Sequence, residues 1–298
     1  MGEGKISIYR FMSAGCNGCD VQILECLVPR YRLEELGVEI VSTPEEANVL
    51  AITGGINVKG LEELKNAYER LRPPKIVIAV GNCAVTKGIF SDGYPMVGPP
   101  DQIVPVNLYI PGCPPRPQAI VSAIAKILGA SIEMRADYWH TPKGFRGKHE
   151  FDGDKCIGCG ACAQICSSEA IEVHDEDGKR IIRVNFGICT FCAFCQDICP
   201  TEAIRLTGEY HLSTVERENA YVENEVEMHK CRVCGTYYVP VRQIDWANKR
   251  IIEEADISVE LSGELRKAIE ICPDCRMKID NIRRAKRILV QLSLRAWE

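Results

Sequence analysis

Cysteine is the residue type through which this sequence could do the most chemistry. The 298-residue chain holds 17 cysteines, and all but Cys26 fall into four groups of four. Four thiolates are what a tetrahedral zinc ion or a cubane iron–sulfur cluster requires, so the grouping predicts four metal sites. The odd cysteine count in a chain of this length argues against a small disulfide scaffold.

The most specific pattern is a run of four cysteines that occurs twice in the middle of the chain. The run C-x2-C-x2-C-x3-C repeats after 33 residues, with Pro200 after the second copy and Ser167 after the first. In such runs three cysteines hold one [4Fe–4S] cluster and the fourth ligates the other. One expected ligand set is Cys156, Cys159, Cys162 and Cys199, and the other is Cys166, Cys189, Cys192 and Cys195. The segment resembles bacterial two-cluster ferredoxins, which implies electron transfer.

The cysteines of the first half lie where predicted strands end. Strands are predicted over residues 5–11, 38–41, 49–53, 76–80 and 106–110, and helices over 19–28, 60–71 and 116–128. This alternation predicts an α/β domain with a flavodoxin-like parallel sheet and helices on both faces, over residues 1–135. Such sheets bind ligands at the carboxyl ends of their strands. The expected third [4Fe–4S] set is therefore Cys16, Cys19, Cys83 and Cys113, whereas Cys26 is expected in the core.

Two C-x2-C pairs predict a further metal site in a C-terminal tail over residues 213–298. The expected ligands are Cys231, Cys234, Cys272 and Cys275. Zinc is the default metal for two such pairs. Mononuclear iron is the alternative, because CRVCGTYYV and CPDC resemble rubredoxin knuckles, although Arg276 stands where rubredoxin has glycine. His229 lies near enough in the sequence to replace a thiolate.

Between the sheet domain and the tail, residues 136–212 are expected to form an α+β ferredoxin domain. Residues 172–187 are expected to form a hairpin that turns at Asp177-Gly178. The four histidines of residues 136–212 are expected to face solvent: His140, His149, His174 and His211.

Composition narrows the class of protein. The net charge is −5 and 26% of the residues are charged, so a nucleic-acid partner is not expected. No apolar run approaches the roughly 20 residues that span a bilayer, and the first residues show no secretory signal pattern. No nucleophile–base pair is evident. We therefore expect a chain that moves electrons, either in the cytosol or held at a membrane by partners.

Four motifs carry a resemblance to a known family. They are GCNGCDVQILE, ITGG, VGNCAV and IPGCPPRP, within residues 5–130. They resemble the small subunit of the energy-converting, membrane-bound [NiFe] hydrogenases and the related 20 kDa subunit of complex I. Complex I has two adjacent cysteines where this chain has Cys16-x-x-Cys19, which is the hydrogenase arrangement. The resemblance implies that Cys16, Cys19, Cys83 and Cys113 ligate a cluster beside the [NiFe] or quinone site of a large partner subunit.

Residues 143–280 are similar to the ferredoxin subunit of formate hydrogenlyase complexes. The chain thus looks like a fusion of two subunits, joined near residues 131–145. The resemblance implies an electron-transfer subunit of a membrane-associated [NiFe] hydrogenase, held at the cytoplasmic face of the cell membrane by membrane subunits. A ferredoxin or a formate dehydrogenase module would donate electrons, and three [4Fe–4S] clusters would carry them to the [NiFe] site for proton reduction to H2.

Two other functions are open at this point. The same electron route could end in a complex I-like quinone or sulfur-reducing oxidoreductase without nickel. A free-standing iron–sulfur redox sensor is an alternative of a different class.

Overall fold

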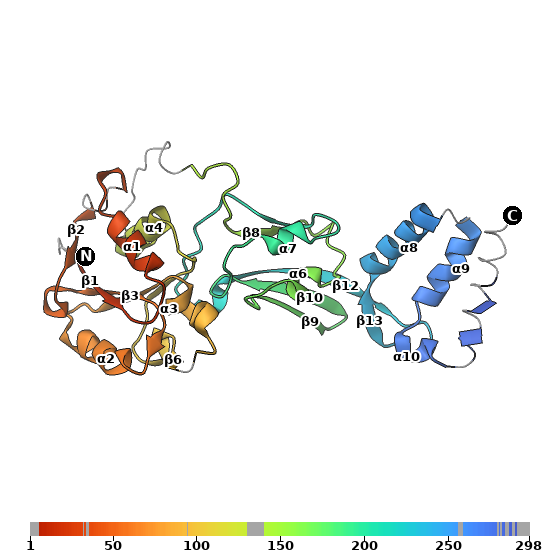
Figure 1. Cartoon of the computed structure of the whole chain (residues 1–298), viewed down its shortest axis with the longest axis horizontal. Helices are drawn as coiled ribbons and strands as arrows, with labels where there is room; N and C mark the ends of the chain where they lie inside the picture. Colours follow the sequence, from red (N-terminus) through yellow and green to blue (C-terminus); the bar gives the residue numbers. More distant parts are fainter. Residues whose placement is uncertain are drawn as a thin grey trace.

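Three parts follow one another along an elongated molecule: a sheet domain, a ferredoxin domain and a largely helical tail (Figure 1). The computed structural model describes residues 6–129 apart from 32, 34, 35 and 94, residues 140–255, and residues 259–290 apart from 279, 281, 284, 285, 288 and 289. The boundary expected at residue 135 lies outside the described residues. Among the described helices, none has the length and apolar character needed to cross a membrane.

Five parallel strands form the sheet of the N-terminal domain, in the order β2-β1-β3-β5-β7. They are β1 (Ile6–Met12), β2 (Val38–Val41), β3 (Val49–Thr53), β5 (Ile76–Val80) and β7 (Leu108–Ile110). This order is that of flavodoxin-like sheets, so the predicted fold is confirmed. Two shorter strands, β4 (Ile56–Asn57) and β6 (Met96–Gly98), pair with each other in a separate antiparallel ladder.

Helices cover both faces of this sheet, as predicted. They are α1 (Gly18–Glu25), α2 (Gly60–Arg70), α3 (Asn82–Thr86) and α4 (Pro117–Leu128). Residues of α1 and α4 share one core with the sheet, and residues of α2 share the other. The first of these cores includes Cys26, whose side chain is fully buried, so its expected core position is confirmed.

Strand β3 shows why this sheet was readable from the sequence. All five of its residues are buried, because Val49 and Ala51 point into the core under α1 and α4 while Leu50 and Ile52 point into the core under α2. A parallel strand covered on both faces appears in the sequence as an unbroken apolar run.

The ferredoxin domain is built on the predicted hairpin. Its strands are β9 (Ile171–Glu176) and β10 (Lys179–Asn185), joined by a turn at residues 177–178. Two one-turn helices, α6 (Ala161–Gln164) and α7 (Phe194–Asp197), and a short pair, β8 (His149–Phe151) with β11 (Ile204–Leu206), complete it. Ile182 and Val184 of β10 are buried together with four of the domain's cysteines in one core.

The tail begins on the same sheet as the ferredoxin hairpin. Strand β12 (Tyr221–Lys230) pairs with β10, and β13 (Tyr237–Pro240) pairs with β12, which gives the order β13-β12-β10-β9. One sheet thus runs across the boundary expected at residue 212. The helices α8 (Val241–Ala255), α9 (Val259–Ile269) and α10 (Pro273–Arg276) follow.

Candidate metal centres

The carboxyl ends of three parallel strands bring four thiols of the N-terminal domain together. Cys16 and Cys19 lie between β1 and the first turn of α1, Cys83 lies on α3 directly after β5, and Cys113 follows β7. Burial and, to a smaller extent, the neighbouring Cys83, Cys113 and Cys16 together raise the pKa of Cys19 to about 12. The four thiols therefore share one electrostatic environment, at the sheet edge where parallel sheets bind ligands.

Close backbone approach around these thiols depends on glycine. Gly81 has φ +85°, and a Cβ built on it would lie 2.1 Å from Sγ of Cys19. Gly54 has φ +80°, and its Cβ would lie 2.5 Å from the carbonyl oxygen of Ala14. These positions accept no side chain because the sulfur and the neighbouring loop occupy that space.

The two repeated runs exchange their fourth cysteines in space. Cys156, Cys159, Cys162 and Cys199 line one small cavity. Cys189 interacts electrostatically with Cys195, Cys166 and Cys192. The structure thus brings together both sets that the spacing predicted. Cys162 also interacts electrostatically with Cys195 of the other set.

The backbone repeats along with the sequence. Gly158 and Gly160 have positive φ angles, and so do Phe191 and Ala193 at the same positions of the second copy. The N–H of Ala170 donates to Sγ of Cys166 at 3.3 Å. Its counterpart, the N–H of Ala203, donates to Sγ of Cys199 at 3.2 Å. Such N–H donors stabilise negative charge on sulfur, as expected around a bound iron–sulfur cluster.

Burial acts against ionisation of three of these thiols. It raises the pKa values of Cys162 and Cys189 to about 12 and that of Cys195 to about 11. Metal-bound cysteine is a thiolate, so a positively charged metal group entering the site displaces these protons. Sets of four gathered sulfurs with backbone N–H donors aimed at them therefore suit a [4Fe–4S] cluster.

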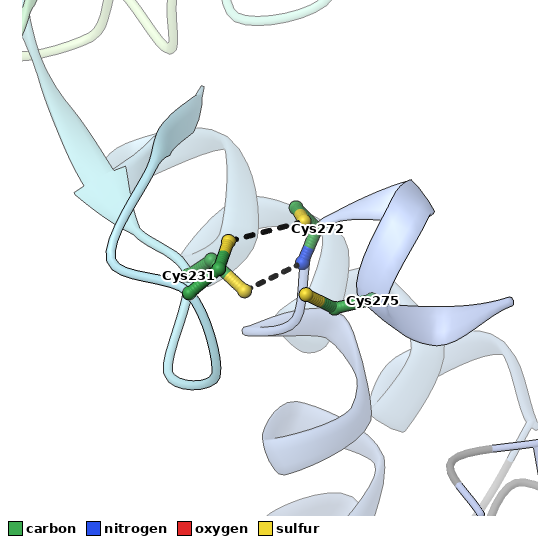
Figure 2. Close-up of side chains that lie close together, drawn as sticks. Cys231, Cys272 and Cys275 are labelled. Carbon is green, nitrogen blue, oxygen red and sulfur yellow. Dashed lines mark hydrogen bonds between the residues drawn. The ribbon is translucent and has the colours of Figure 1, made fainter. Parts of the chain in front are cut away.

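The four thiols of the tail form the tightest group. The sulfurs of Cys231, Cys234, Cys272 and Cys275 all lie within 4.8 Å of one another. Figure 2 shows the side chains of Cys231, Cys272 and Cys275 gathered between the β12–β13 hairpin and the start of α10. This spacing suits one tetrahedral ion with four sulfur ligands.

Backbone N–H groups prepare this site for a cation. Cys231 Sγ accepts from the N–H of Cys272 at 3.3 Å and from that of Val233 at 3.4 Å. Desolvation acts against ionisation, but these N–H groups and that of Cys234 lower the pKa of Cys231 to about 6. His229 is not part of the group; its ring lies edge-on to Tyr238, with centroids 6.0 Å apart.

A buried asparagine, which no local sequence pattern indicates, connects the first and second domains beside the thiols. Asn82 is 2% exposed. Its Nδ2 donates to the carbonyl oxygen of Cys189 at 2.6 Å, and its Oδ1 accepts from the N–H of Gly112 at 2.7 Å. Nearby, Thr86 Oγ1 donates to the carbonyl oxygen of Gly187 at 2.6 Å. The two partners of the Cys189 contact are 107 residues apart, which no local motif reveals.

The opposite end of the ferredoxin domain contacts the tail. A Cβ built on Gly158, in the loop that follows Cys156, would lie 2.7 Å from Cγ of Pro240, the last residue of β13, directly before α8. Arg242 of α8 donates a hydrogen bond to the carbonyl oxygen of Gly153. The set made of Cys156, Cys159, Cys162 and Cys199 (the Cys156 set) therefore lies on the tail side of the ferredoxin domain. The set made of Cys166, Cys189, Cys192 and Cys195 (the Cys189 set) lies on the side of the sheet domain.

The expectation for His149 was wrong, because this histidine is 2% exposed. Its Nε2 lies 3.9 Å from Sγ of Cys189, and its ring packs against those of Phe186 and Phe191, which also stack on each other. Burial lowers its pKa to about 4. The strand alternation of β8 turns His149 inward and Glu150 outward. The other three histidines are exposed, as expected.

Comparison with known proteins divides the chain in the same way. Residues 16–127 match the family described as NADH ubiquinone oxidoreductase, 20 Kd subunit, and residues 155–203 match the 4Fe-4S dicluster domain. The resemblances predicted from the motifs to the 20 kDa subunit and to a two-cluster ferredoxin are confirmed by these matches.

Three relatives each match less than half of the chain. An uncharacterized protein of Methanocaldococcus jannaschii is 47% identical over 41% of this chain and 82% of its own length. A probable membrane-bound hydrogenase subunit of Pyrococcus furiosus is 40% identical over 43% of this chain and 76% of its own length. Formate hydrogenlyase subunit 7 of Escherichia coli is 39% identical over 41% of this chain, which spans about half (48%) of that relative.

Proposed function

Because this chain belongs to the NADH ubiquinone oxidoreductase 20 kDa subunit family and carries a 4Fe-4S dicluster domain, we propose that it is the electron-transfer subunit of a membrane-bound [NiFe] hydrogenase of the formate hydrogenlyase type. At the coarser level, it is an oxidoreductase subunit that binds 4Fe–4S clusters and serves a membrane-bound hydrogenase or a complex I-like complex. The observation that carries the finer proposal is the serial placement of its thiol sets.

The serial order follows from contacts at both ends of the ferredoxin domain. The Cys156 set lies toward the tail and the Cys189 set lies toward the sheet domain. The set made of Cys16, Cys19, Cys83 and Cys113 (the Cys16 set, or N-terminal set) lies within the sheet domain. Cys162 and Cys195 interact, so the two sets of the ferredoxin domain adjoin. An electron that enters at the Cys156 set therefore meets the Cys189 set before the Cys16 set.

In this proposal each of the three sets holds one [4Fe–4S] cluster. The ligands are Cys156, Cys159, Cys162 and Cys199, then Cys166, Cys189, Cys192 and Cys195, and finally Cys16, Cys19, Cys83 and Cys113. A [4Fe–4S] cluster, when bound, accepts and returns one electron. The N–H groups of Ala170, Ala203 and Phe191, each donated to a cysteine sulfur, stabilise the thiolate ligands.

The partner large subunit would dock on the surface around Cys16 and Cys113, both of which are exposed. Apolar side chains next to this site are also exposed: Met12 by 50% and Val21 by 55%. Exposed apolar groups beside a redox site are typical of an interface with a permanent partner. We propose that this partner carries the [NiFe] site and that membrane subunits hold the complex at the cytoplasmic face.

The tail would hold one zinc ion in a structural role, with mononuclear iron as the alternative. Its four sulfurs connect the β12–β13 hairpin to the turn that begins α10. The tail side of the ferredoxin domain is where a ferredoxin or a formate dehydrogenase module would deliver electrons.

A nickel-free, complex I-like terminus is the second candidate, because the matching family model is itself described by a quinone oxidoreductase. The spacing Cys16-x-x-Cys19 favours the hydrogenase, since the complex I subunit has adjacent cysteines there.

Metal analysis of the anaerobically purified full chain tests the three-cluster proposal. We expect about 12 iron atoms, about 12 sulfide ions and about one zinc ion per chain. A Cys83→Ser variant should lose about 4 iron atoms and leave the zinc content unchanged. A wild-type chain with about 8 iron atoms would contradict a cluster at the Cys16 set.

The terminus is tested on the native complex purified with its large subunit. Stoichiometric nickel together with H2 evolution would support the hydrogenase. An intact complex that lacks nickel would instead support the complex I-like candidate, and a chain that purifies from its own cells as a free monomer would favour the redox sensor.

A further inference from the structure

Asn82 is placed to connect the Cys16 set with the Cys189 set. It precedes Cys83 in the sequence, so its backbone is bonded directly to one ligand of the first set. Its Nδ2 reaches the carbonyl oxygen of Cys189, a ligand of the other set, at 2.6 Å. One hydrogen bond thus completes an otherwise covalent path between cysteines of two different domains.

The same side chain also holds the third ligand loop of the N-terminal set. Asn82 Oδ1 accepts from the N–H of Gly112 at 2.7 Å, and the backbone N–H of Asn82 donates to the carbonyl oxygen of Gly112 at 3.0 Å. Gly112 directly precedes Cys113. The Cys83 loop, the Cys113 loop and the Cys189 backbone therefore meet at one carboxamide.

Burial makes the chemistry of this carboxamide specific. Asn82 is 2% exposed, so water cannot replace either of its partners. One partner is an N–H donor and the other is a carbonyl acceptor, and only an amide side chain offers both an acceptor and a donor at this size. Aspartate would place a carboxylate oxygen against the Cys189 carbonyl, and leucine would leave both partners unpaired.

From this geometry we infer that Asn82 is a positioning residue for electron transfer between the N-terminal set and the Cys189 set. It fixes the ligand loops of the two sets relative to each other and provides the hydrogen-bonded step between them. Each crossing moves one electron, so one bound group is oxidised as the other is reduced, and no bond or proton changes place. The inference rests on the proposed function, because it requires a cluster in each set.

Two variants remove the contact with Cys189, and only Asn82→Asp does so while keeping the contact with the Gly112 N–H. Asn82→Asp keeps an acceptor for the Gly112 N–H, Asn82→Leu keeps the volume without charge, and both lose the donor to Cys189. Thr86→Val is the control within the same domain junction, because it removes the hydrogen bond to Gly187 across the junction and leaves the Asn82 side chain unchanged. It also removes the local hydrogen bonds of Thr86 Oγ1 to the carbonyl oxygen of Asn82 and from the N–H of Gly88. Asn48→Ala is the control for losing an asparagine-to-backbone bond elsewhere, since Asn48 Oδ1 accepts from the N–H of Ser7.

The measurement is rapid-freeze EPR of the full, cluster-loaded chain after flash reduction, with iron and sulfide counted in each sample. We expect both Asn82 variants to redistribute the electron between the two sets about tenfold more slowly, with iron unchanged, as expected for losing one hydrogen bond on the route. Thr86→Val and Asn48→Ala should match the wild type. In the fully reduced chain, the magnetic coupling between the two sets should also weaken in both Asn82 variants.

Three results would overturn the inference. The first is redistribution of the electron at the wild-type rate in either Asn82 variant. The second is that Thr86→Val slows this redistribution as much as the Asn82 variants do, which would make domain docking the cause. The third is loss of iron in both Asn82 variants, which would make the residue a support for cluster binding. By contrast, a wild-type chain that lacks the N-terminal cluster would contradict the proposed function itself.

Discussion

At the scale of single residues, the N-terminal set depends on one position without a side chain. Gly81 has φ +85° and ψ 158°, a backbone conformation that essentially only glycine adopts, and Sγ of Cys19 lies 2.1 Å from the position its Cβ would take. The residue therefore combines a backbone requirement with a space requirement, and the space requirement can be examined by comparison with another glycine of positive φ. Gly37 has φ +70° and nothing within 4 Å of its Cβ position.

We expect Gly81→Ala to remove the N-terminal cluster and spare the other two. The new methyl group must displace Cys19 Sγ, so about 4 of the roughly 12 iron atoms should be lost. Gly37→Ala also places a side chain at positive φ, at a cost of about 1–2 kcal/mol, and should keep all its iron because its Cβ position is open. Iron and sulfide per chain measure the difference. Full iron in Gly81→Ala would show that the loop yields without disturbing the ligand.

The tail site allows a second test with single residues. Cys272→Ser should abolish binding of the tail metal, because Cys272 supplies both a sulfur ligand and an N–H donor to Cys231. His229→Ala should keep the metal, since the group of four sulfurs contains no histidine.

Zinc and iron analysis after desalting measures both variants. A stoichiometric loss of metal in His229→Ala would show that the histidine replaces one of the thiolates in the loaded protein.

At the scale of elements, the loop that follows Cys156 packs directly against the end of β13, before α8. The Cβ position of Gly158 lies 2.7 Å from the Pro240 ring, whereas that of Gly160, two residues on, lies 4.0 Å from its nearest neighbour in Val173. Both glycines have similar positive φ angles. The tail is therefore held against one side of the loop.

We expect Gly158→Ala to loosen the tail and Gly160→Ala to leave it in place. Overpacking against Pro240 costs about 1–3 kcal/mol beyond the backbone strain that the two variants share. Hydrogen exchange of α8 should therefore accelerate about tenfold or more only in Gly158→Ala. Equal exchange in the two variants would mean that this contact does not hold the tail.

Elements differ in how far the sequence could predict them. All five parallel strands and the β9–β10 hairpin were predictable, because buried runs such as Val49–Thr53 and the turn at residues 177–178 leave a local signal. Strand β12 was missed because its partner β10 sets its role, and its own residues are mostly charged or polar (YVENEVEMHK). Spacing predicts three of the four cysteine sets and the ends of the predicted strands predict the fourth, whereas Asn82 and His149 acquire their contacts only through distant residues.

At the scale of the whole molecule, several contacts hold the sheet domain against the rest of the chain. Tyr109 and Thr214 exchange backbone hydrogen bonds of 2.8 and 2.9 Å. Arg217 forms an ion pair with Asp101 at 2.9 Å. Together with the hydrogen bonds of Asn82 and Thr86, these contacts hold the two parts together non-covalently, in addition to the chain that joins them.

We therefore expect the two halves to stay together when the chain is cut. A protease site inserted between residues 135 and 136 and cleaved in the folded protein should leave fragments that co-elute at about 1 μM, which requires about 8 kcal/mol of association free energy. Size-exclusion chromatography with detection of both fragments measures this. Separate elution would show that the junction depends on the covalent link.

The junction between Tyr109 and Thr214 also bears on how a cell makes the complex. If the sheet domain and the ferredoxin domain, the two electron carriers, were separate gene products, unequal synthesis would leave some copies of one without the other. Here the two carriers meet at an effective concentration set by the chain itself, independent of expression level or dilution. Every translated copy therefore contains both carriers in equal number, and assembly of the complex requires one recruitment event in place of two.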